Sequence, residues 1–158
     1  MKPTIYFLDD QIGKGRAQVI RALTNRLILE ATNLNLIVRP LDIQTDLVYV
    51  IESEGLNIGL MSHENPEQRP ADLIRFLHEE DCQLIFCSSN WNKELNKAIA
   101  DLVVNKKFQS IYLKSAFSSL LQVEQLLAYE VSKLVEIIRI SIEYSSSDKE
   151  QEQYLKVV

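Results

Sequence analysis

Short runs of β-forming residues alternate with longer segments of helical periodicity along this chain. Residues 4–8 form an apolar run that ends at two aspartates, which predicts a buried strand followed by a loop. From Arg16 to about Thr32, apolar residues recur every three or four positions, which predicts a one-sided amphipathic helix. Strands that alternate with helices form a mainly parallel sheet with helices packed on its faces. The alternation therefore assigns the chain to the α/β class.

The same alternation continues to about residue 144. Further strands are predicted at residues 36–41, 46–51, 56–61, 82–87 and 108–113. Further helices are predicted at residues 67–79 and 119–144, and another follows the N-cap cluster at 88–90 and continues through Leu102. Only residues 52–55, with Gly55 among them, separate two of these strands, which predicts an antiparallel hairpin. Pro40 lacks an N–H donor and favours an edge strand or a strand end.

We predict one three-layer α/β domain over residues 1–144, with a mainly parallel sheet, helices on both faces and one antiparallel hairpin. Residues 145–158 contain three serines and a charged patch, which predicts a mobile C-terminal tail.

The charge balance excludes some classes of partner. The chain has 158 residues, of which 17 are Lys or Arg and 22 are Asp or Glu, so its net charge is −5. This balance provides no overall positive field to attract nucleic acid or an anionic membrane. The sequence contains no apolar run of about 18 residues and no segment with the features of a secretory signal. We therefore expect a cytoplasmic protein that binds neither nucleic acid nor a membrane.

The segment between the first strand and the first helix is the strongest candidate for a functional site. Ligands of α/β proteins bind at the carboxyl ends of strands, where a helix N-terminus offers free backbone N–H groups. Residues 10–17 lie at such a place and read DQIGKGRA, against the phosphate-binding pattern G-x-x-x-x-G-K-[ST]. In this segment, and more weakly over residues 1–140, the chain resembles the P-loop NTPases, especially the small nucleotide-kinase-like members.

The resemblance implies a phosphate or nucleotide ligand. The residues that it assigns to this ligand are Gly13, Lys14, Gly15, Arg16 and Ala17. Asp10 stands in place of the first Gly of the pattern, Arg16 in place of its Lys, and Ala17 in place of its magnesium-binding Ser or Thr. Ser88 and Ser89 follow the strand at which the family has an acid that orients magnesium. We therefore expect a domain that binds a phosphate or nucleotide, or serves as an interaction module, without metal-dependent phosphoryl transfer.

Two alternatives account for the same residues. In the first, Gly13 and Gly15 only permit a tight turn between strand and helix. In the second, the aspartates at 9–10, the serines at 88–89 and Lys114 resemble the acids, switch hydroxyl and lysine of a phosphoacceptor receiver domain. Such a domain here would lack its phosphoacceptor Asp, because Glu52 follows the middle strand. A receiver requires an all-parallel sheet of order 2-1-3-4-5, whereas the P-loop interpretation expects the hairpin.

The remaining reactive residues predict no catalytic or metal site. His63 has no accompanying nucleophile in a suitable context, so no catalytic residue is assigned. The two His and two Cys residues lack zinc-ligand spacing, and the sequence identifies no cofactor. Cys82 and Cys87 are five residues apart in one predicted strand. This odd spacing predicts opposite faces of the strand and therefore two unpaired core thiols.

The last predicted helix has more apolar residues than one stripe requires. Ile137 and Ile140 fall outside its main stripe and are rimmed by Glu136, Arg139 and Glu143. An exposed apolar patch with a charged rim is typical of an interaction surface. We therefore predict a homodimer formed through this C-terminal helix.

Overall fold

The structure is a computed structural model that describes residues 2–9, 16–40, 47–62, 69–88, 93–114 and 123–157. Within these ranges the strands are β1 (Thr4–Asp9), β2 (Ile37–Pro40), β3 (Leu47–Ser53), β4 (Leu56–Ser62), β5 (Cys82–Ser88) and β6 (Gln109–Lys114). The helices are α1 (Arg16–Leu34), α2 (Pro70–Glu79), α3 (Lys93–Asn105) and α4 (Val123–Val157). One sheet contains all of these strands in the order β2-β3-β4-β5-β1-β6.

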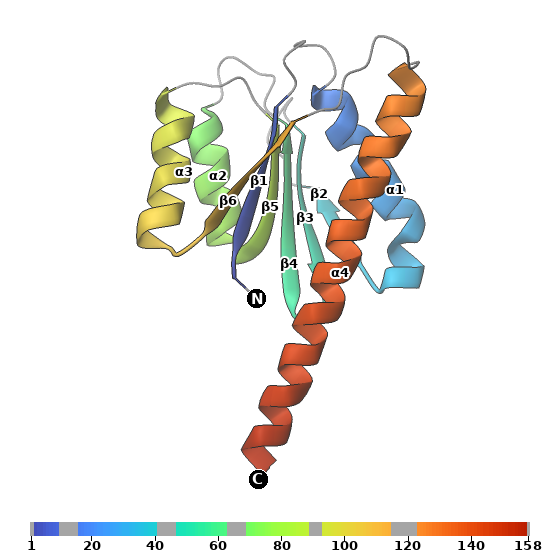
Figure 1. Ribbon diagram of the computed structural model, residues 1–158, viewed down its shortest axis with the longest axis vertical. Helices are drawn as coiled ribbons and strands as arrows, with labels where there is room; N and C mark the ends of the chain where they lie inside the picture. Colours follow the sequence, from blue (N-terminus) through green and yellow to red (C-terminus); the bar gives the residue numbers. More distant parts are fainter. Residues whose placement is uncertain are drawn as a thin grey trace.

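Helices cover both faces of this sheet. Figure 1 shows α2 and α3 on one side of the sheet and α1 and α4 on the other. One buried cluster joins the sheet to α2 and α3, and a second joins it to α1 and α4. Strands β4, β5, β1 and β6 run parallel, whereas β3 is antiparallel to both β2 and β4. The predicted three-layer α/β fold with a mainly parallel sheet and an antiparallel hairpin is confirmed.

Glycine and proline lie where the sequence predicted turns and strand ends. Gly55 has a φ of 97° in the turn between β3 and β4, a conformation that glycine adopts without a steric penalty. Pro40 is the last residue of β2, which lies at an edge of the sheet, where the missing N–H is tolerated. The mixed sheet also differs from the all-parallel 2-1-3-4-5 sheet that a receiver domain requires.

Helix α4 extends further than the sequence predicted. We expected a mobile tail from Ser145, but the structure continues the helix through Val157. Figure 1 shows this part of α4 beyond the edge of the sheet at which β1 begins. Residues 145–157 include several Glu, Gln and Lys residues, which have good helix propensity, and an existing helix is extended at low cost.

The two cysteines are buried and free, but they do not lie on opposite faces. Cys82 and Cys87 belong to the same buried cluster, on the α2 and α3 side. Asn57 of β4 pairs with Cys82 of β5, but the next residue, Ile58, pairs with Leu84. Strand β5 therefore has one extra residue at this point. Such a bulge reverses the side-chain alternation, and the expectation of opposite faces was wrong for this reason.

Both thiols should be unreactive while the protein is folded. Burial raises the pKa of Cys82 and of Cys87 to about 12, so almost no thiolate forms at pH 8. An unfolded thiol loses its proton near pH 9, whereas the folded thiols keep theirs to about pH 12. The free energy of unfolding should therefore fall as the pH rises through this interval.

We expect a thiol-specific reagent at pH 8 to modify neither cysteine in the native protein and both in denaturant. Modification of either thiol faster than global unfolding would contradict this prediction.

Candidate functional site

The carboxyl ends of four parallel strands meet at one edge of the sheet, which we call the carboxyl edge. The last residues of these strands are Ser62 of β4, Ser88 of β5, Asp9 of β1 and Lys114 of β6. Ser62 pairs in register with Ser88, and Asp9 pairs with Lys114. Two hydroxyl residues, an acid and a lysine therefore follow one another along the carboxyl edge.

The connections place a topological switch point at this edge. Strand β1 leads into α1 on one face of the sheet, whereas the adjacent strand β5 leads into α3 on the other face (Figure 1). Where neighbouring strands send their helices to opposite faces, a crevice opens beyond their carboxyl ends. This arrangement makes the ends of β1 and β5 the expected position for a ligand.

Helix α1 begins at the same edge. It runs antiparallel to β1 (Figure 1), and its residues Ile20, Leu23 and Leu27 are buried in one cluster with Leu60 and Phe86 of the sheet. The first N–H groups of a helix have no partner within the helix, and the helix dipole is positive there. The packing of α1 therefore directs its first N–H groups and a partial positive charge towards the carboxyl edge.

Two buried hydroxyl groups lie at the ends of β4 and β5. The exposed fraction is 1% for Ser62 and 0% for Ser88. Among the residues that the structure describes, neither Oγ atom has a hydrogen-bond partner. Leu60 and Phe86, two residues earlier in each strand, lie in the cluster on the α1 side. Because side chains alternate along a strand, both serines lie on the α1 side as well.

Only some of the residues predicted to bind phosphate lie within the described ranges. Gly13, Lys14 and Gly15 lie outside the described residues. Arg16 and Ala17 are the first two residues of α1, at the carboxyl edge. Asp10 and Ser89 also lie outside the described ranges.

Sequence reasoning did not single out Ser62. It ended the strand at Met61 and assigned Ser62 to the following loop, whereas the structure makes Ser62 the last residue of β4. The only sequence signal was a hydroxyl residue directly after an apolar run, and this signal is common in loops. Ser88 was considered as part of an N-cap cluster, as a substitute for a missing acid and as the switch hydroxyl of a receiver, but not together with Ser62.

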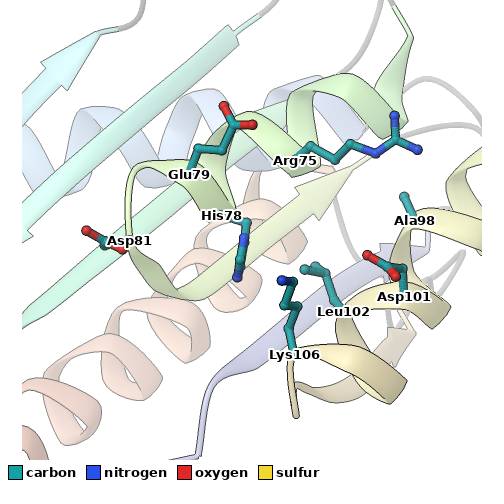
Figure 2. A pocket seen from close by; sticks show the side chains of 8 residues that line it. All are labelled: Arg75, His78, Glu79, Asp81, Ala98, Asp101, Leu102 and Lys106. Carbon is teal, nitrogen blue, oxygen red and sulfur yellow. The ribbon is translucent and has the colours of Figure 1, made fainter.

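A hollow lies between α2 and α3, near the opposite edge of the sheet. Its volume is about 440 Å³, and Figure 2 shows His78, Leu102 and Lys106 pointing towards the same space. The side chains of Glu79 and Asp81 point away from it (Figure 2).

Two of the charged groups around this hollow, Arg75 and Asp101, make local contacts. Arg75 forms an ion pair with Asp72 at 3.2 Å, and Asn105 donates a hydrogen bond to Asp101 at 2.5 Å. The ring of His78 contacts that of Phe108 edge-on, with 5.8 Å between centroids. No buried polar atom without a partner is found among the described residues that line the hollow. The carboxyl edge is therefore the better candidate site.

Within the described ranges, no three His, Cys, Asp or Glu residues are grouped so as to hold a metal ion. Nor does any helix among the described residues combine the length and the apolar character that crossing a bilayer requires. No family model, curated protein or solved structure matches the chain. Its function is therefore inferred from the chemistry of the carboxyl edge.

Proposed function

We propose that this protein binds a phosphate-bearing ligand, such as a nucleotide, at the N-terminus of α1. The supporting observation is that α1 begins at the switch point between β1 and β5. A helix N-terminus in this position is a common anion site, because backbone N–H groups and the helix dipole both favour negative charge. The proposed contacts are made by the segment Gly13, Lys14, Gly15, Arg16 and Ala17.

The proposed role is binding without metal-dependent phosphoryl transfer. Ala17 has no side-chain oxygen where the resemblance expects a magnesium-binding Ser or Thr, and Ser88 and Ser89 stand where it expects an acid that orients magnesium. Metal-dependent transfer requires oxygen ligands that hold magnesium against the phosphates. We therefore expect no magnesium-dependent hydrolysis of ATP or GTP at a rate typical of an NTPase.

Two opposing effects set the affinity of this site. The helix N-terminus stabilises an anion by up to about 2 kcal/mol in a partly buried site. Asp9 ends β1 and Asp10 follows it in the sequence, and the negative charge of both carboxylates repels an anion. The expected result is weak binding of phosphate and nucleotides.

Removing the charge of Asp10 should tighten this binding. We expect D10N and D10G each to lower the Kd for inorganic phosphate and for ADP about fivefold, because about 1 kcal/mol of repulsion is lost. The measurement is isothermal titration calorimetry of the wild-type protein and both variants, with and without Mg²⁺.

A matched control is D81N, which removes a charge at the opposite edge of the sheet, where Asp81 precedes β5. This variant should keep the wild-type Kd. Unchanged or weaker phosphate binding by D10N and D10G would count against a phosphate site at this segment.

We further propose that the protein forms a homodimer through α4. Tyr129, Ile140 and Tyr144 are exposed large side chains on this helix, and their spacing of 11 and 4 residues places them on one side. Arg139 forms ion pairs with Glu136 and Glu143 beside Ile140. Ile137, which we had assigned to the dimer surface, instead packs against the core cluster on the α1 side.

The variant I140E should dissociate this dimer. Its carboxylate would be placed in an apolar contact, which is unfavourable without a partner. Sedimentation velocity at micromolar concentration is expected to show a dimer for the wild-type protein and a monomer for the variant. A wild-type monomer that I140E leaves unchanged would exclude this interface.

A further inference from the structure

Ser62 and Ser88 form an unusual pair in the core of this protein. Each hydroxyl is at least 99% buried, and neither has a hydrogen-bond partner among the described residues. Leaving a buried hydroxyl without a partner destabilises a protein, and most buried polar groups in folded proteins are hydrogen-bonded. By contrast, the hydroxyls of Thr4 and Thr24, also buried, donate to the carbonyls of Lys2 and Ile20 at 3.0 and 2.7 Å.

The two hydroxyl residues are placed to act together. They are register partners in adjacent parallel strands, so their backbones are about 4.8 Å apart. An O–H···O hydrogen bond is about 2.8 Å long, so two donors at this separation can reach the same oxygen or two oxygens of one oxyanion. Both lie on the face that α1 covers, and both are at the edge where α1 begins.

We propose that Ser62 and Ser88 donate hydrogen bonds to a phosphoryl group of the ligand, and that this group is bound free of a metal ion. This inference rests on the proposed function, because it completes the site whose other donors are the N–H groups of α1. The pair is complementary to an anionic oxygen, because each hydroxyl supplies a donor and carries no negative charge.

Neutral donors at these two positions determine the form of the ligand. A magnesium ion bound to the same phosphoryl oxygens would need carboxylate or other oxygen ligands from the protein or from water. Neither β4 nor β5 ends in a carboxylate, and the acid of this edge, Asp9, ends the neighbouring strand β1. The serine pair therefore needs no magnesium ion to bind a phosphoryl group, whether this group belongs to inorganic phosphate or to a nucleotide.

The test combines ligand affinity with stability. The variants S62A, S88A and the double variant are titrated with inorganic phosphate and with ADP, in EDTA and in MgCl₂. The melting temperature of each unliganded variant is measured in parallel. T4V is the matched control, because the hydroxyl of Thr4 is buried but already bonded, at the opposite end of β1.

We expect each serine variant to bind both probes about tenfold more weakly, as for the loss of a hydrogen bond to a charged group. Their unliganded melting temperatures should equal or exceed that of the wild type, because an unpartnered hydroxyl is removed. T4V should bind normally and melt at a lower temperature. The wild-type protein should bind ADP in EDTA at least as tightly as in MgCl₂.

Three results would overturn the proposal. If the wild type binds the probes and the serine variants bind equally well, the hydroxyls take no part and a buried water satisfies them instead. If the variants lose affinity and also have lower melting temperatures than the wild type, the serines have a structural role. If binding by the wild type requires magnesium, the metal-free form of the ligand is excluded. Failure of the wild type to bind either probe would instead refute the proposed function itself.

Discussion

Replacing Phe86 by Ala is expected to lower the free energy of unfolding by about 3–5 kcal/mol. Phe86 is fully buried in β5, between β4 and β1, and its ring stacks on that of Tyr6 with 5.0 Å between centroids. The substitution removes the largest buried side chain of this strand and leaves a cavity that the surrounding sheet cannot close. Equilibrium unfolding in urea, followed by circular dichroism, measures the loss.

Tyr112 provides a matched aromatic control for this variant. It lies in the edge strand β6, its ring stacks on Phe7 with 5.7 Å between centroids, and about half of its surface is exposed. We expect Y112A to cost about 1 kcal/mol, since part of the ring is already in water. Equal losses for the two variants would show that burial in the sheet does not determine the cost.

Replacing Ile138 by Ala is expected to cost about 2–5 kcal/mol. Ile138 is fully buried and belongs to the cluster that joins α4 to α1 and the sheet. Loss of its side chain weakens the contact that holds α4 on the domain. The same urea experiment measures the change.

The nearby residue Ile140 tests whether this cost comes from burial. Ile140 lies two positions further along α4, and 55% of its surface is exposed. We expect I140A to change the free energy of unfolding by less than about 0.5 kcal/mol when measured on the monomer. A large loss for I140A, or none for I138A, would mean that α4 packs on the domain through a different face.

The sequence predicted the parts of this fold that depend on local chemistry. Gly55 predicted the hairpin turn, Pro40 predicted an edge strand or a strand end, and the apolar run at 82–87 predicted a strand. Each of these follows from the backbone freedom, hydrogen-bonding capacity or burial of a few neighbouring residues. Such properties can be evaluated without knowing which strands pair.

Features that depend on pairing could not be predicted in the same way. The bulge that places Cys82 and Cys87 in one cluster arises from the register between β4 and β5, which no single strand specifies. The relation of Ser62 to Ser88 requires the same register, across 26 residues of sequence. For the segment 10–17, only its position between β1 and α1 can be compared with the prediction.

The length of α4 has a practical consequence for studying the carboxyl edge. At 35 residues the helix is about 52 Å long, whereas a strand of seven residues spans about 23 Å. Helix α4 begins at the carboxyl edge, where the parallel strands end. Its far end therefore projects well beyond the opposite edge of the sheet (Figure 1). A fluorophore or a surface anchor attached there would be remote from the ends of β1 and β5. Immobilised in this orientation, the molecule would hold its candidate site towards the solution, with α4 as a rigid spacer.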